Sequence, residues 1–174
     1  MKVIENLATI ERNIQQACER SKREEKQVKV IAVTKYVSVE RTKEAVEAGV
    51  THIGENRIEG LLEKRQYLGD KPIWHFIGTL QTRKVKDVVN HVDYIHSLDR
   101  LSLAEEIQKR ANQPINCFVQ VNASGEESKH GLSPQDVIPF IREIQKLDRV
   151  HVVGLMTMAP FTEDEVTLRN CFRK

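Results

Sequence analysis

The residue of this sequence with the clearest chemical potential is Lys35, which directly follows the apolar segment at residues 30 to 33. If the stem of this lysine lies against an apolar core, desolvation disfavours the charged ammonium form. A neutral lysine amine attacks aldehydes and forms a Schiff base with them. We therefore interpret Lys35 as a lysine for imine chemistry. The alternative is a lysine at a strand end whose ammonium group simply reaches solvent.

Other residues that follow short apolar segments are candidates for contacts to a ligand. Asn56 lies in the segment GENR, His75 in IWHFIG and Met156 in GLMTMAP. Two of them have a simpler structural interpretation. Asn56 could cap a helix that begins near Arg57, and His75 could be a hydrogen-bonded histidine of the core.

Other common kinds of site have little support in the sequence. His96 and His130 are expected on the surface, and no HExxH or similar spacing indicates a metal site. The serines lack the GxSxG pattern of a hydrolase. The three cysteines are widely spaced without a CxxC pair, which is typical of a reducing compartment. The net charge of +2 argues against a strong field for nucleic acids or anionic lipids.

Short apolar segments alternate with helical patterns along the whole chain. Helices are predicted at residues 4 to 23, 39 to 49 and 100 to 112, and Gly49 is expected to end the second of them. The segments at the predicted strands are rich in β-branched residues, as in strands buried on both faces. The strands are predicted to begin near Val28, Thr51, Pro72, Val92, Ile115 and Val150.

This alternation predicts parallel βα units, for which two architectures compete. The near-constant spacing of the strands and the absence of a GxGxxG turn favour a (β/α)8 TIM-type barrel over a doubly wound open sheet. Only six strands are visible in 174 residues. We therefore expect residues 1 to 174 to be a single, incomplete barrel domain that lacks the last two βα units. The N-terminal segment has no signal-peptide pattern, and no apolar run of 18 residues predicts a membrane span.

Five segments together resemble the pyridoxal 5′-phosphate (PLP) homeostasis protein family, whose members are similar to the N-terminal barrel domain of alanine racemase. The match extends over nearly the whole chain in the family's order and spacing, which makes the combination specific. The matching segments are AVTKY (32 to 36), GENR (54 to 57), WHFIGTLQTRK (74 to 84), VNASGEESKHG (121 to 131) and GLMTMAP (154 to 160).

The resemblance implies a cofactor site. Lys35 would form the internal aldimine with PLP, Asn56 would lie near the cofactor ring or its O3′, and His75 and Met156 would line the same cavity. Arg83 departs from the family, which commonly has asparagine there. The resemblance also implies a phosphate cradle and an arginine that faces the pyridine nitrogen, and the segments that supply them are absent from this sequence.

The resemblance implies reversible storage or delivery of PLP in the cytoplasm, without catalytic turnover. Racemisation needs a second acid/base on the opposite face of the substrate, and neither a second domain nor a convincingly placed tyrosine supplies one. The alternatives are a PLP-dependent amino-acid racemase of the same barrel class and an interaction protein without a cofactor. PLP is the expected ligand, nucleic acids and membranes are not expected partners, and the chain is a monomer or a homodimer paired through exposed sheet edges.

Overall fold

Each of the first five strands of the structure is followed along the chain by a helix and then by its neighbour in the sheet. The computed structural model describes residues 2–126 and 129–173. The order across the sheet is β1-β2-β3-β4-β5-β6. A doubly wound sheet reverses its strand order at an internal strand, whereas barrel strands follow one another in sequence order, so the barrel-type architecture is confirmed. The strands are β1 Ile31–Val33, β2 His52–Glu55, β3 Ile73–Phe76, β4 Tyr94–Leu98, β5 Ile115–Gln120 and β6 Val150–Met156.

The helices agree with the periodicity of the sequence, and the three predicted helices end within two residues of the expected bounds. Ser38 caps α2 by accepting a hydrogen bond from the backbone N–H of Arg41 at 3.3 Å. Gly49 ends the same helix with a φ of +108°, as predicted. The α-helices are α1 Val3–Ser21, α2 Val39–Glu47, α3 Ile58–Leu68, α4 Val85–Val88, α5 Leu101–Arg110, α6 Val137–Ile144 and α7 Glu165–Cys171. Short 3-10 helices are η1 Glu25–Gln27, η2 Thr82–Lys84, η3 Val89–His91 and η4 Pro134–Asp136.

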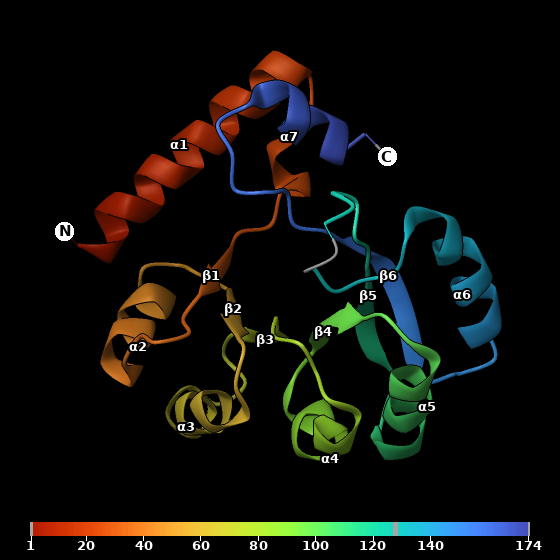
Figure 1. Cartoon of the computed structure of the whole chain (residues 1–174). Coiled ribbons are helices and arrows are strands. Elements are labelled where there is room, and N and C mark those ends of the chain that lie inside the picture. Colours follow the sequence, from red (N-terminus) through yellow and green to blue (C-terminus); the bar gives the residue numbers. More distant parts are fainter. Residues whose placement is uncertain (1, 127–128, 174) are drawn as a thin grey trace. The chain divides into compact units, whose positions relative to one another are not determined.

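The first of two compact units is Met1–Trp74, and its strands are short. β1 pairs in parallel with β2, so that Val33 lies opposite Gly54. Helices α2 and α3 lie outside these strands (Figure 1). Ile53 on β2, Leu61 on α3 and Trp74 on β3 are fully buried. These buried residues pack helix α3 against strands β2 and β3.

The second unit, His75–Lys174, contains the longer strands. β3, β4, β5 and β6 pair in parallel in that order, and the β5–β6 register shifts between Cys117 and Phe118. Helices α4, α5 and α6 lie outside the strands of this unit (Figure 1). Ile95, Leu103 and Ile107 are fully buried in it. Burial also raises the pKa of the Cys117 thiol to about 12, so this cysteine is an apolar core residue.

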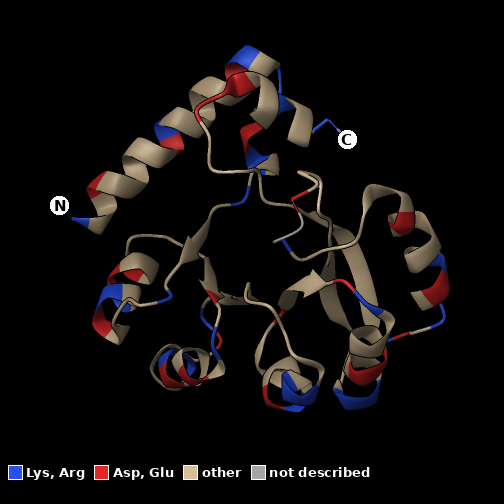
Figure 2. Ribbon diagram, viewed as in Figure 1, with Lys and Arg blue, Asp and Glu red and all other residues tan. Residues whose placement is uncertain are grey.

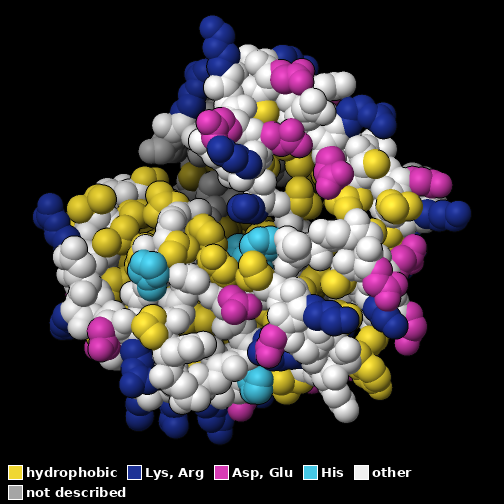
Figure 3. All heavy atoms as spheres, turned by 180° about the vertical axis from the view of Figure 1, so that it is seen from behind, with side chains coloured by type: hydrophobic (Ala, Val, Ile, Leu, Met, Phe, Trp, Pro, Cys, Tyr) yellow, Lys and Arg dark blue, Asp and Glu magenta, His cyan; other side chains and the backbone are white. Residues whose placement is uncertain are grey.

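Charged residues lie mostly on the helices, and the strands contain few of them (Figure 2). Over the face drawn in Figure 3, basic and acidic side chains are interspersed. This distribution agrees with the near-balance of charge in the sequence. No helix among the described residues is long and apolar enough to cross a membrane.

Replacing Gly131 with alanine is expected to destabilise the loop that follows β5. This glycine has a φ of +119°, and an added Cβ would lie 2.8 Å from the backbone nitrogen of Asn122. We expect Gly131→Ala to lower the free energy of unfolding by roughly 2 kcal/mol or more, measured by urea denaturation. Gly125→Ala is the matched control, because Gly125 has a φ of +77° but no atom within 4 Å of an added Cβ. The control should lose only about 1 kcal/mol. Equal losses in the two variants would contradict the role of the close contact.

Candidate functional site

Lys35 lies in a tight turn directly after β1. The Thr34 carbonyl accepts a hydrogen bond from the backbone N–H of Val37 at 2.9 Å, which closes the turn. Tyr36 has a φ of +67°, at the position where a type II turn normally places glycine. Lys35 and Tyr36 are both exposed. The expectation that the Lys35 stem packs against an apolar core is therefore wrong, because the turn carries this side chain into solvent.

A buried ion pair adjoins this turn. The Lys64 ammonium and the Glu55 carboxylate lie 2.5 Å apart, and their side chains are 4% and 2% exposed. Lys64 also donates a hydrogen bond to the Thr34 carbonyl at 2.8 Å, and the Thr34 hydroxyl donates to Glu55 at 2.5 Å. These contacts join the carboxyl ends of β1 and β2 to helix α3. They satisfy two buried charges that would otherwise be costly.

Asn56 is half-buried in the bend between β2 and α3. Arg57, and not Asn56, is the N-cap residue of α3, so the alternative role of Asn56 as the cap of this helix is wrong. The Asn56 amide therefore has no capping duty that competes with a ligand contact.

Two cations lie near the ring of the exposed Tyr36. The Lys35 ammonium lies 6.0 Å from the ring centroid and the Arg57 guanidinium 5.7 Å from it. At these distances a cation is attracted to the face of an aromatic ring. The amine and the guanidinium together form a positive group at the carboxyl ends of β1 and β2. Such a group suits an anionic ligand, and arginine in particular matches the oxygens of a phosphate.

In the second unit, His75 and His96 form a buried pair. Their ring nitrogens, Nδ1 of His75 and Nε2 of His96, lie 2.9 Å apart. His75 also stacks on Tyr94 at 4.5 Å between ring centroids, and His96 lies 4.6 Å from Phe118. The interpretation of His75 as a hydrogen-bonded core histidine agrees with the structure, and the expectation that His96 is on the surface is wrong. Burial lowers the pKa of His96 to about 4, so this ring is neutral at physiological pH.

Met156 is the last residue of β6, and it is half-buried. Its carbonyl accepts a hydrogen bond from the backbone N–H of Val121 at 2.8 Å, at the end of β5. The loop that follows β5 includes Glu127 and Ser128, which lie outside the described residues, and the exposed His130, which was expected on the surface. Arg83 is exposed in η2 and donates to the side chain of Gln81 at 2.9 Å.

The structure therefore brings Lys35 and Asn56 to one end of the strands in the first unit. It places His75 within a strand of the second unit and Met156 at the carboxyl end of another. Sequence reasoning missed Lys64 and the burial of His96. Lys64 carried a usable signal, because Leu61, Lys64 and Leu68 share one helical face and all three are buried. A lysine on an apolar face predicts a buried charge with a partner.

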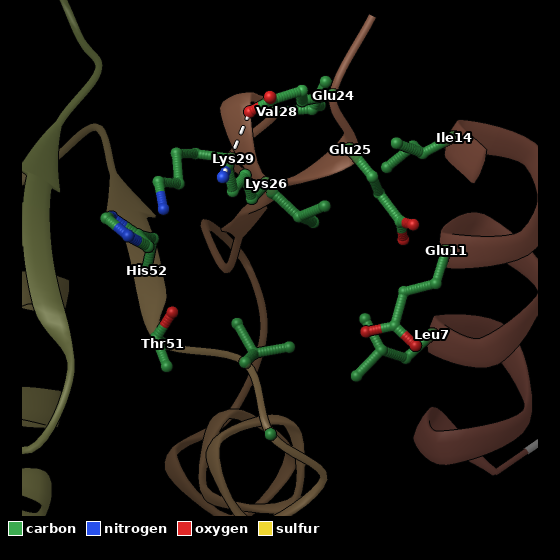
Figure 4. Close-up of a pocket in the computed structure, with 13 residues that line it drawn as sticks. Leu7, Glu11, Ile14, Glu24, Glu25, Lys26, Val28, Lys29, Thr51 and His52 are labelled. Atoms are coloured by element: carbon green, nitrogen blue, oxygen red, sulfur yellow. Dashed lines mark ion pairs between the residues drawn. The ribbon is translucent and has the colours of Figure 1, made fainter. Parts of the chain in front are cut away.

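A cavity of about 720 Å³ lies at the other end of the strands in the first unit (Figure 4). Helix α1 contributes Leu7, Glu11 and Ile14 to its lining. The segments that precede β1 and β2 supply most of the remainder, so this cavity opens at the amino ends of the strands and away from the turn of Lys35. Functional groups of parallel βα folds gather at the carboxyl ends. Among the described residues, no group of three His, Cys, Asp or Glu side chains could hold a metal ion.

The similarity to known proteins extends over nearly the whole chain. Residues 6–173 match the family model of the alanine racemase N-terminal domain. The pyridoxal phosphate homeostasis protein of Aquifex aeolicus is 41% identical over 100% of this chain and 78% of its own length. The protein of the same name from Pasteurella multocida is 38% identical over 99% of this chain and 76% of its own length.

Solved structures give the same result for the fold. PipY of Synechococcus elongatus, with PLP bound, superposes with a TM-score of 0.81 at 29% identity, over 98% of this chain and 77% of PipY. An alanine racemase of Clostridium difficile superposes with a TM-score of 0.76 over 99% of this chain and 45% of its own. Its identity is 19%, so this second likeness concerns the fold alone.

The buried His96 is expected to make stability depend on pH. Its pKa is about 4 in the folded chain, against 6.5 for an ordinary histidine, so the unfolded chain binds more protons between these two values. Stability should therefore fall as the pH is lowered from 6.5 to 4, with His96 accounting for roughly 2–3 kcal/mol. Urea denaturation across this range should show a shallower loss for His96→Gln than for the unchanged protein. His130→Gln is the control at an exposed histidine. If stability depends on pH equally in the unchanged protein and in both variants, His96 is not the source of that dependence.

Proposed function

Because the chain belongs to the alanine racemase N-terminal domain family, and within it to the pyridoxal phosphate homeostasis proteins, we propose that it binds PLP and holds it reversibly for storage or delivery. Lys35 is the proposed attachment point. The observation that carries the proposal is an exposed lysine amine in a hydrogen-bonded turn at the carboxyl end of β1, with an arginine over the ring of the neighbouring Tyr36. PLP has an aldehyde for the amine and a phosphate for a cationic group.

The chemistry that PLP supplies is reversible condensation. The lysine nitrogen bonds to the aldehyde carbon and water leaves, and addition of water restores the free amine and aldehyde. The exposure of Lys35 supports reversibility, because both water and PLP reach the amine from solvent. Asn56 is half-buried beside the same turn and offers an amide to a hydroxyl group of the ring.

His75 and Met156 stay proposed cofactor contacts. Their support is position, since His75 lies on β3 and Met156 ends β6, and ligands of parallel βα folds bind near the carboxyl ends of strands. The relatives are longer than this chain, which spans 76% and 78% of two of them. We propose a complete barrel with two further βα units as the setting for the phosphate contacts.

We propose a binding role without catalytic turnover. The relatives are named for homeostasis of pyridoxal phosphate, and that name states no reaction. The alternative of a racemase draws only on likeness to alanine racemases, which at 19% identity concerns the fold. A cytoplasmic location also stays a prediction.

Removing the Lys35 amine should abolish the Schiff base. Titration of the protein with PLP is expected to produce the visible absorbance band of a protonated Schiff base, and Lys35→Arg should lose this band because a guanidinium does not condense with an aldehyde. Lys43→Arg is the control, at an exposed lysine on α2. A Lys35→Arg protein that keeps the full band contradicts the proposal.

Exposed edge strands predict association of two copies. Val33 on β1 is 50% exposed and Leu155 on β6 is 58% exposed, which are high values for apolar strand residues. Edge strands of this kind pair with other chains. Sedimentation equilibrium should therefore show a dimer at high protein concentration. A monomeric mass throughout the concentration series would count against pairing through these edges.

A further inference from the structure

The turn that presents Lys35 is held by a charge that lies outside it. The peptide carbonyl between Thr34 and Lys35 accepts two hydrogen bonds, from the Val37 N–H at 2.9 Å and from the Lys64 ammonium at 2.8 Å. The first bond belongs to the turn itself. The second comes from α3 and fixes the plane of the peptide that leads into Lys35.

We infer that Lys64, oriented by Glu55, is a positioning residue for the amine of Lys35. The Glu55 carboxylate is the counter-ion of Lys64 at 2.5 Å and also accepts from the Thr34 hydroxyl at 2.5 Å. Thr34 is thereby held at its carbonyl, at its hydroxyl and at its backbone N–H, which donates to the Gly54 carbonyl at 3.0 Å. The residue before Lys35 has little freedom left. This inference rests on the proposed attachment of PLP at Lys35.

Tyr36 provides the second observation. A non-glycine residue with a φ of +67° is strained, and such strain persists only where the surroundings over-determine the backbone. Tyr36 as a residue is 79% exposed, so close packing does not hold it. The contacts that hold this turn are on the Thr34 side, and they come from Glu55 and Lys64. Strained backbone of this kind clusters at ligand sites, where it serves pre-organisation.

Stability alone does not account for the ion pair. Replacing a buried pair with apolar residues of similar size is often neutral or stabilising, whereas removing one partner leaves an uncompensated charge. The Glu55 carboxylate also has little room, because a Cβ added at Gly60 would lie 3.2 Å from its Oε2. The pair is therefore closely packed as well as buried. What apolar side chains could not supply is the hydrogen bond to the Thr34 carbonyl.

The test separates positioning from stability with two variants. Glu55→Met combined with Lys64→Met removes both charges and leaves no unpaired one. The Thr34 hydroxyl loses its acceptor, so the urea midpoint should fall, but by less than in Leu61→Ala, the control described below. The dissociation constant for PLP, from the absorbance of the Schiff base, should rise about tenfold or more, because a small displacement of a reacting group has effects of this size. Leu61→Ala is the matched control on α3, where Leu61 is fully buried. Leu61→Ala should lower the urea midpoint because it leaves a cavity in the core. It should leave the dissociation constant for PLP unchanged.

A second readout needs no cofactor. Hydrogen exchange of the Val37 amide, relative to the amide of Ile53 on β2, should accelerate in the double variant and not in Leu61→Ala. If the double variant does not fold, Lys64→Arg is the variant that tests the inference, since it keeps the positive charge and moves the hydrogen-bond donor. The dissociation constant of Lys64→Arg for PLP should rise several-fold.

The inference is overturned if the double variant, or Lys64→Arg in its place, binds PLP as the unchanged protein does. It is also overturned if affinity in all variants follows the urea midpoint alone. Failure of the proposed function has a different signature, because the unchanged protein would then show no Schiff base band while the Val37 exchange readout still reports on the turn.

Discussion

A buried ion pair between helix α3 and strand β2 is the interaction on which the geometry around Lys35 depends. Glu55 and Lys64 are almost without solvent contact, and each charge is compensated by the other and by Thr34. Moving such charges out of water costs several kcal/mol for each ion, which good geometry offsets. Here the geometry ties two strand ends and a helix to one peptide carbonyl. The exposed amine of Lys35 therefore follows a peptide that is hydrogen-bonded both within the turn and from α3.

The ion pair also bears on the specificity of Lys35, the proposed attachment point. A lysine made reactive by burial relies on desolvation, and Lys35 lacks it because the turn is exposed. The position of the Lys35 amine has to supply the selectivity for this lysine instead, since other lysines of the chain are also accessible to an aldehyde. The neighbouring Arg57, held at the ring of Tyr36, adds a group that attracts phosphate. An open, positioned amine favours reversible holding of PLP more than chemistry on a substrate.

The architecture could be read from the sequence because it depends on local patterns. The apolar segments that begin near Ile115 and Val150 coincide with β5 and β6, and α2 ends at the predicted glycine. The details around the site depend on pairs far apart in the chain. Thr34 and Lys64 are 30 residues apart, and His75 and His96 are 21 apart. No local pattern pairs such residues. For that reason His96 was wrongly expected on the surface, and the position of Lys35 alone left two interpretations open, of which the structure shows the exposed lysine.

The most direct measurement locates the bond between PLP and the protein. Borohydride adds hydride to the carbon of a Schiff base and converts it to a stable secondary amine, so the cofactor stays attached during digestion. Mass spectrometry of the peptides then identifies the modified lysine at a PLP concentration near the dissociation constant. The account predicts a single modified residue, Lys35, in the peptide that contains the turn. Modification spread over several lysines such as Lys29 and Lys43, or absent from Lys35, would contradict it.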